Sequence, residues 1–126
     1  MSKMLAIALL VVVGVSLESA APAHAEDYGV VVLTNPTRST LFYEFQWGAN
    51  GAWAKSYLSP GGIKAHYVEL DANNCAPAPN IRFDNGVGNV KLYALSFYAA
   101  NRVNAHSGKL YSFYSNGPYF DLSSKR

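Results

Sequence analysis

Apolar and polar residues alternate along residues 41–58, and this pattern predicts a β-hairpin. Two runs rich in aromatic residues flank Asn50-Gly51, the dipeptide that most readily takes the positive φ angles of a type I′ turn. That turn pairs Phe45 with Ser56. Because successive side chains of a strand point to opposite faces, one face carries Leu41, Tyr43, Phe45, Trp47, Ala54, Ser56 and Leu58, and the other carries Phe42, Glu44, Gln46, Trp53, Lys55 and Tyr57. We expect the first face to enter the core and the second to be mixed.

Turn signals on both sides of this hairpin predict two further strands. Residues 29–35 are rich in β-branched valine and end at Asn35-Pro36-Thr37, which indicates a turn. The sequence Ser59-Pro60-Gly61-Gly62 is typical of a type II turn and precedes a strand over residues 63–70.

If the chain reverses at this second turn within one sheet, the strand over residues 63–70 lies beside the hairpin. Its Ile63, Ala65 and Tyr67 then join the core face. On the outer face, cross-strand rows form from Gln46, Lys55 and His66, and from Glu44, Tyr57 and Lys64.

The middle of the chain contains a loop, a half-buried strand and an apolar segment. Residues 71–79 have the composition of a loop, and residues 80–84 alternate so that Ile81 and Phe83 point inward. Residues 85–89 form a glycine-rich turn. Residues 90–99 are apolar on both faces, which fits a fully buried central strand better than a short helix because of their aromatic content.

The last part of the chain predicts a loop followed by another hairpin. Residues 101–108 are polar and include His106, so we expect an exposed loop. Asn116-Gly117 then separates two strands and pairs Phe113 with Phe120. Seven to eight short strands of this kind predict an all-β fold, either a small antiparallel β-sandwich or a partly closed barrel, in one domain over residues 26–126.

The N-terminal residues have the pattern of a secretory signal peptide. Lys3 precedes an apolar run over residues 4–15, and Ala23-His24-Ala25 supplies the small residues that signal peptidase accepts. A membrane anchor is the alternative, but the run is shorter than the ~20 residues that cross a bilayer. We therefore expect cleavage after Ala25, export to the periplasm or the extracellular space, and no membrane span in the mature chain.

The charge and cysteine content narrow the partners that we expect. The formal net charge is +2, which is too small to indicate nucleic-acid binding. Charged residues make up 14% of the chain, below the ~25% of typical domains, so tyrosine and amide side chains must cover much of the surface.

Cys75 is the only cysteine, which excludes an internal disulfide. A lone cysteine is usually buried, but its loop neighbours leave a disulfide-linked homodimer open.

The sequence contains no catalytic or metal-binding motif. After cleavage only His66 and His106 remain, too few to predict a metal site or another cofactor. The loop over residues 84–89 resembles a calcium loop only faintly, and Arg82 with Asp84 fits a surface pair. A small hydrolase would require one histidine within hydrogen-bond reach of Asp84, Asp121 or a serine.

The surplus of aromatic residues is the best indication of function. The candidate ligand-binding residues are Gln46, Trp53, Lys55, Tyr57 and His66, because flat rings beside amide and charged groups suit a sugar or a protein partner. The alternative is that Trp53 covers the backbone of Gly48 and that Tyr57 merely covers the sheet.

Several segments together resemble a family of small exported β-rich proteins of planctomycete-type bacteria. The likeness covers most of the mature chain and lies in residues 46–53, 58–61, 79–84, 108–113 and 121–122, with His66. The resemblance implies an envelope or secreted protein and supplies no catalytic residues, since this family has no established activity. Cys75 and its loop lie outside the shared pattern.

These observations predict an exported, non-enzymatic binding or interaction module. Its partner would be cell-surface glycan or an envelope protein, held by the aromatic and polar sheet face. The alternative is a structural or assembly component of the cell envelope, in which free edge strands pair with neighbouring molecules.

Overall fold

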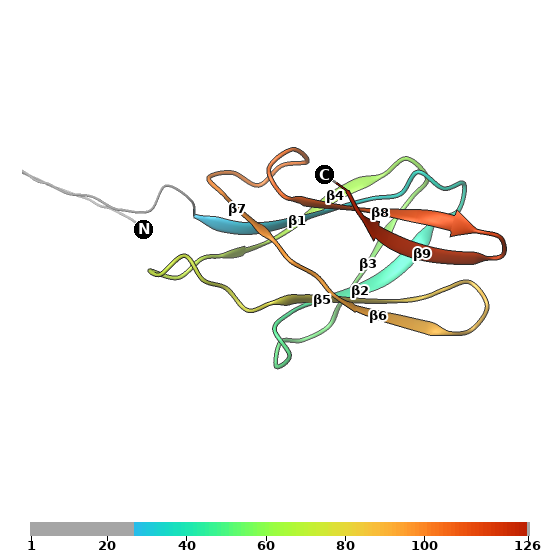
Figure 1. The fold of residues 1–126 in the computed structure, drawn as a ribbon, viewed down its shortest axis with the longest axis horizontal. Coiled ribbons are helices and arrows are strands. Elements are labelled where there is room, and N and C mark those ends of the chain that lie inside the picture. Colours follow the sequence, from blue (N-terminus) through green and yellow to red (C-terminus); the bar gives the residue numbers. More distant parts are fainter. Residues whose placement is uncertain (1–26, 126) are drawn as a thin grey trace, which may run out of the picture.

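The computed structural model describes residues 27–125, which form nine β-strands and no helix (Figure 1). The expected signal peptide over residues 1–25 lies outside the described residues. The strands are β1 (Tyr28–Thr34), β2 (Leu41–Trp47), β3 (Ala54–Leu58), β4 (Ile63–Glu69), β5 (Pro79–Asp84), β6 (Val90–Ala94), β7 (Tyr98–Ala100), β8 (Lys109–Asn116) and β9 (Tyr119–Ser124). The all-β prediction is confirmed, with more strands than expected.

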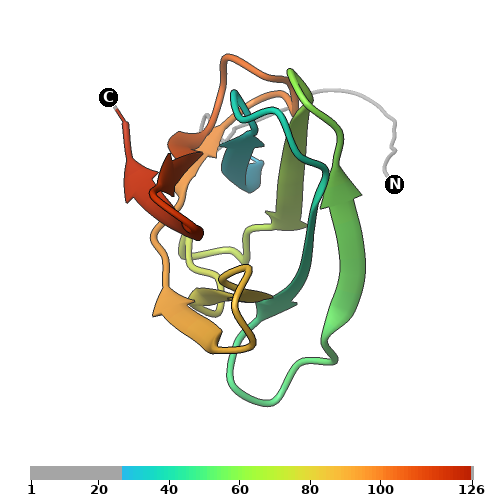
Figure 2. The same ribbon diagram turned by 90° about the vertical axis from the view of Figure 1, so that its right-hand side faces the viewer.

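The strands form two sheets that face each other. Sheet A has the order β4-β1-β8-β9, with β7 also paired to β1, and sheet B has the order β3-β2-β5-β6. The β1–β8 pair is parallel, and the other pairs are antiparallel. Figure 2 shows strands around the interior, with β6 and β9 on one side and β3 and β4 on the other. The arrangement is a β-sandwich, and the strands of the described region do not close into a barrel.

The core lies between the inner faces of the two sheets. Its buried members are Val31, Leu33, Leu41, Tyr43, Phe45, Leu58, Ile81, Phe83, Leu95, Tyr111 and Phe113. The fully buried ring of Phe113 connects the sheets, because it packs against Phe83 and Tyr43 with ring centroids 5.2 Å and 6.0 Å away. Each such side chain contributes about 1.5–3 kcal/mol through its removal from water.

The β2–β3 hairpin has the predicted faces, but the predicted register and turn are wrong. Phe45 pairs with Ala54 rather than with Ser56. The Gly51 N–H donates to the Gly48 carbonyl at 3.1 Å, so the turn is centred one residue earlier than a type I′ turn at Asn50-Gly51 requires. The Gln46 amide stabilises this wider loop by donating to the Gly51 carbonyl at 2.8 Å. A shift of two residues leaves every side chain on its expected face.

Strand β4 does not continue the sheet of the hairpin, which corrects the predicted rows. The turn over residues 59–62 forms, with a 2.8 Å hydrogen bond from the Gly62 N–H to the Ser59 carbonyl, but it leads into sheet A, where His66 pairs with Val31. The reason is Asn35, whose backbone exchanges hydrogen bonds with Gly61 and Gly62 and ties the turn to the end of β1. The faces of β4 are therefore reversed, and Ile63 points to solvent instead of the core.

The predicted central strand over residues 90–99 is also wrong. It divides into β6, at the edge of sheet B, and β7, in sheet A. Between them the chain crosses from one sheet to the other. The Leu95 N–H donates to the Pro79 carbonyl, and the Ser96 N–H donates to the Tyr111 hydroxyl. These bonds hold the crossing segment at the end of the core.

The β8–β9 hairpin forms with a register that differs from the prediction by two residues. Phe113 pairs with Leu122 instead of Phe120, and Asn116 pairs with Tyr119. The two turn residues are therefore Gly117 and Pro118. Gly117 has a φ of 62°, as the first position of a type II′ turn requires, and proline suits the second. The inward Ile81 and Phe83 and the turn over residues 85–89 agree with the prediction.

Candidate functional site

The outer face of sheet B exposes several large apolar side chains. We call this surface the sheet-B face, and it consists of Phe42, Glu44, Trp53, Lys55, Tyr57, Arg82, Asp84, Val90 and Leu92. The exposed fractions are 70% for Phe42, 68% for Val90, 65% for Leu92 and 54% for Tyr57. Such a concentration of exposed apolar surface is typical of binding sites.

The centre of the outer face of sheet A is covered, although Ile63 and Tyr67 on its edge strand β4 are exposed. Val30 and Val32 point away from the core on β1, yet both are fully buried. The segment over residues 101–108 lies over them, and in Figure 1 it is seen above β1, on the side away from sheet B. A Cβ on Gly108 would lie 2.7 Å from Val30 Cγ1 and 2.9 Å from Val32 Cγ2, so the packing is close.

A row of charged and apolar side chains crosses all four strands of the sheet-B face. Glu44 pairs with Lys55 on β3 and with Arg82 on β5, and Arg82 pairs with Leu92 on β6. The Arg82 Nε forms an ion pair with Glu44 Oε1, while the guanidinium carbon lies 4.1 Å from the centroid of the Trp53 ring. These two contacts fix both the arginine and the indole.

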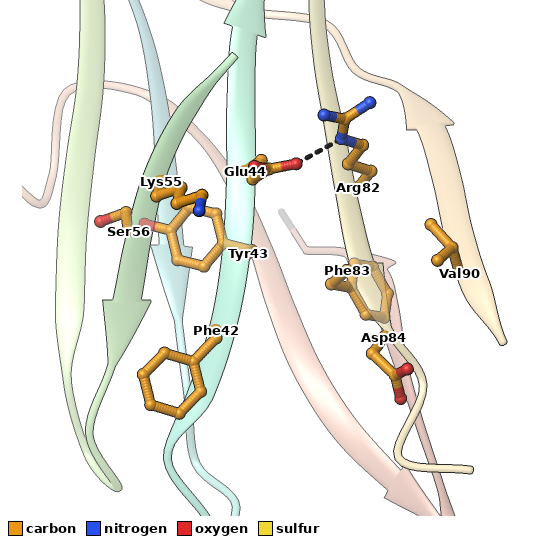
Figure 3. Close-up of a pocket in the computed structure, with 9 residues that line it drawn as sticks. All are labelled: Phe42, Tyr43, Glu44, Lys55, Ser56, Arg82, Phe83, Asp84 and Val90. Carbon is orange, nitrogen blue, oxygen red and sulfur yellow. Dashed lines mark hydrogen bonds and ion pairs between the residues drawn. The ribbon is translucent and has the colours of Figure 1, made fainter. Parts of the chain in front are cut away.

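A shallow groove of about 330 Å³ lies in this face (Figure 3). Phe42 borders it on one side and Val90 on the other, and Glu44, Lys55 and Arg82 lie toward one end. Phe42 is supported by Tyr57, with ring centroids 5.9 Å apart. The groove is near the lower end of the roughly 300–1,000 Å³ range of ligand pockets.

Asp84 is oriented at the end of the groove by its own turn. Its Oδ1 accepts hydrogen bonds from the Gly86 N–H at 2.7 Å and the Gly88 N–H at 3.3 Å. Arg82 forms an ion pair with Glu44 on the neighbouring strand β2. The sequence had predicted a surface pair of Arg82 with Asp84 instead.

Three of the five predicted ligand-binding residues lie on the sheet-B face, namely Trp53, Lys55 and Tyr57. Gln46 points the same way but is only 6% exposed. Its Oε1 accepts from Asn80 Nδ2 at 3.0 Å and its Nε2 donates to the loop before β3. Gln46 therefore positions the loop that carries Trp53.

His66 does not belong to the sheet-B face, because β4 lies in the other sheet. Its ring stacks on Phe45 at 4.3 Å, and Nε2 lies 2.6 Å from the Tyr43 hydroxyl. Burial lowers the pKa of His66 to about 4, with a smaller contribution from Lys64, and burial raises the pKa of Tyr43 to about 12. His66 is therefore a neutral member of the interior at pH 7.

Six residues of the sheet-B face were not among the predicted ligand-binding residues, namely Phe42, Glu44, Arg82, Asp84, Val90 and Leu92. The alternation of residues 41–47 already placed Phe42 on this face. Val90 and Leu92 could have been found from the short turn over residues 85–89, which brings Asp84 opposite Val90. Cys75 is exposed in the loop before β5 and is not buried as lone cysteines usually are.

The structure and the comparisons add three findings. No group of three or more histidine, cysteine or acidic side chains that could hold a metal ion occurs within residues 27–125. No helix in that range is long and apolar enough to cross a membrane. No known protein-family model, curated protein or solved structure matches the chain.

Proposed function

We propose that this chain is an exported, non-enzymatic binding module that holds a neutral glycan on the sheet-B face. The observation that carries the proposal is the contrast between the two outer faces. The valines at the centre of sheet A are covered by the chain itself, whereas Phe42 on the central strand β2 of sheet B is open to solvent and borders a groove. Export rests on the signal-peptide pattern of residues 1–25.

The groove combines the two features by which proteins bind sugars. The rings of Phe42 and Tyr57 offer apolar surface to the C–H groups of a sugar ring. Lys55 and Arg82 supply hydrogen-bond donors, and Glu44 and Asp84 supply acceptors. Because these four side chains balance in charge, a neutral ligand rich in hydroxyl groups suits the face better than an anionic one.

The positions of the histidines support a binding role over a hydrolytic one. A hydrolase would need an imidazole beside a carboxylate or a serine. The side-chain hydrogen bond of His66 goes to Tyr43, and His106 lies in the exposed segment over residues 101–108.

The test is a glycan array followed by titration calorimetry with the best ligand. We expect binding by the mature protein and at least tenfold weaker binding by Phe42→Ala and Tyr57→Ala, because each loses a stacking ring. Tyr119→Ala is the matched control, since Tyr119 is 46% exposed on β9 outside the sheet-B face.

Two outcomes contradict the proposal. The first is an array on which the folded protein binds no neutral glycan. The second is equal affinity in the wild type, Phe42→Ala and Tyr57→Ala, which would place the ligand elsewhere.

A further inference from the structure

A small polar cavity lies where the edge strands β6 and β9 of the two sheets approach each other (Figure 2). Its volume is about 250 Å³, and its lining residues are Asn85, Lys91, Asn116, Tyr119, Phe120 and Asp121. Two contacts between the sheets hold its walls together. The Phe120 N–H donates to the Asn85 carbonyl at 2.8 Å, and the Tyr93 hydroxyl donates to Asp121 Oδ1. The cavity is therefore built from the junction of the two sheets.

Asn85 contributes a buried hydrogen-bond donor to this cavity. The residue is only 4% exposed. Its Oδ1 accepts hydrogen bonds from the N–H groups of Val87 and Asn89, both at 3.2 Å, which fixes the orientation of the amide. The backbone N–H and C=O of Asn85 are paired as well, but Nδ2 has no acceptor among residues 27–125. Buried polar groups are rarely left without a partner, so Nδ2 indicates that a bound molecule supplies one.

Lys91 and Asp121 bring one charge of each sign to the same cavity. No ion pair between Lys91 and an acidic side chain occurs in the part of the chain that the structure describes. Asp121 Oδ1 already accepts two hydrogen bonds, whereas Oδ2 accepts a long one of 3.4 Å from the Tyr114 hydroxyl and has room for another. The cavity therefore offers an ammonium, an amide N–H and a carboxylate oxygen to a ligand.

We propose that this cavity binds a free α-amino acid as its zwitterion. The ligand carboxylate accepts hydrogen bonds from Asn85 Nδ2 and the Lys91 ammonium, and the ligand ammonium donates to Asp121 Oδ2. This second site does not depend on glycan binding, because none of its lining residues belongs to the sheet-B face.

Charge complementarity selects a zwitterion over other small ligands. A simple carboxylate pairs with Lys91 but is repelled by Asp121, and a simple amine meets the opposite arrangement. A neutral polyol can form hydrogen bonds to both side chains but compensates neither charge. In a free amino acid, one carbon joins the ammonium to the carboxylate, so both charges of the cavity are matched within a short distance.

The volume limits the ligand to a single small amino acid. About 250 Å³ is below the roughly 300–1,000 Å³ of pockets for drug-sized ligands. Phe120 lines the same cavity and offers an apolar surface, so we expect a short apolar side chain such as that of alanine or valine. A residue inside a peptide lacks both charges and is excluded.

Titration calorimetry on the mature protein tests the ligand class, with L-alanine and L-valine as the probes. We expect saturable binding of at least one of them. Propionate and ethylamine each keep only one of the two charges, so they should bind at least tenfold more weakly.

A variant of Lys91 tests the location of the site. Lys91→Met keeps the length of the side chain and removes its charge, so the same amino acid should bind at least tenfold more weakly than to the wild type. Lys125→Met is the matched control, because Lys125 is exposed and lies outside the cavity. Circular dichroism confirms that both variants fold.

Three results would overturn the inference. The first is no saturable binding of either amino acid, which would leave Asn85 Nδ2 to an ordered water. The second is binding of propionate or glycerol as tight as that of the amino acid, which would indicate an anion site or a hydroxyl site instead. The third is equal affinity in the wild type and Lys91→Met, which would place the amino acid elsewhere. None of these results bears on the glycan array.

Discussion

The centre of the outer face of sheet A is buried, whereas apolar side chains on the outer face of sheet B are exposed. Val30 and Val32 on sheet A are fully buried, whereas Val90 on sheet B is 68% exposed. The difference comes from the segment over residues 101–108, which covers Val30 and Val32 and has no counterpart over the sheet-B face in the described region. An apolar residue on a strand therefore indicates a face that must be covered, and the covering can come from a distant segment or from another molecule.

The largest expected effect comes from placing the same charge on both outer faces. Val32→Lys should lower the free energy of unfolding by more than about 4 kcal/mol or prevent folding, because a buried ammonium has no partner there. Val90→Lys should change it by less than about 0.5 kcal/mol, since the side chain is exposed and lies opposite Asp84. Urea denaturation at low protein concentration measures both. Equal losses in the two variants would show that the faces do not differ in the way described.

A second effect, of about 3 kcal/mol, concerns His66 on the inner side of sheet A. The folded protein keeps this imidazole neutral down to about pH 4, whereas the unfolded chain protonates it below about pH 6.5. Between these values the unfolded state binds the additional proton, so the free energy of unfolding falls as the pH is lowered and this contribution stops changing below about pH 4. Urea titrations at several pH values measure the slope.

Two variants separate His66 from other titrating groups. His66→Gln should flatten the pH dependence between about pH 6.5 and 4. His106→Gln, at an exposed position in the segment over residues 101–108, is the matched control. A wild-type slope that persists in His66→Gln would assign the effect to other residues.

The smallest expected change tests how sheet A is covered. Gly108→Ala adds a methyl group 2.7 Å from Val30 Cγ1 and 2.9 Å from the Val30 carbonyl oxygen, so the segment must shift. We expect a loss of about 1–3 kcal/mol and faster hydrogen exchange at β1. Ala105→Ser, at an exposed position of the same segment, is the control. Unchanged stability and exchange in Gly108→Ala would mean that the segment does not press on β1.

The sequence predicts the faces of strands more reliably than their partners. Both hairpins form with registers two residues from the prediction, yet Phe45 still points inward and Lys55 outward. This agreement follows because the alternation of side chains has a period of two and survives a shift of two. The local pattern therefore contains the information that defines the sheet-B face.

Where the chain changes sheets, the local pattern is insufficient. The turn at residues 59–62 has the predicted hydrogen bond, but its direction is set by Asn35, which lies more than twenty residues earlier. This is why His66 was expected beside Lys55 and lies instead against Phe45. The exposed loop predicted over residues 101–108 likewise covers Val30 and Val32, which depends on long-range packing.

The parallel pairing of β1 with β8 has a consequence for the order of events during folding. The first strand cannot complete its sheet until residues 109–112, far along the sequence, are available. Its other partners, β4 and β7, are also distant, so the contacts that close sheet A span long loops and form slowly. A nascent chain that ends before β8 lacks one of the two central strands of this sheet, and we expect it to remain unfolded and sensitive to proteases until β8 has been synthesised.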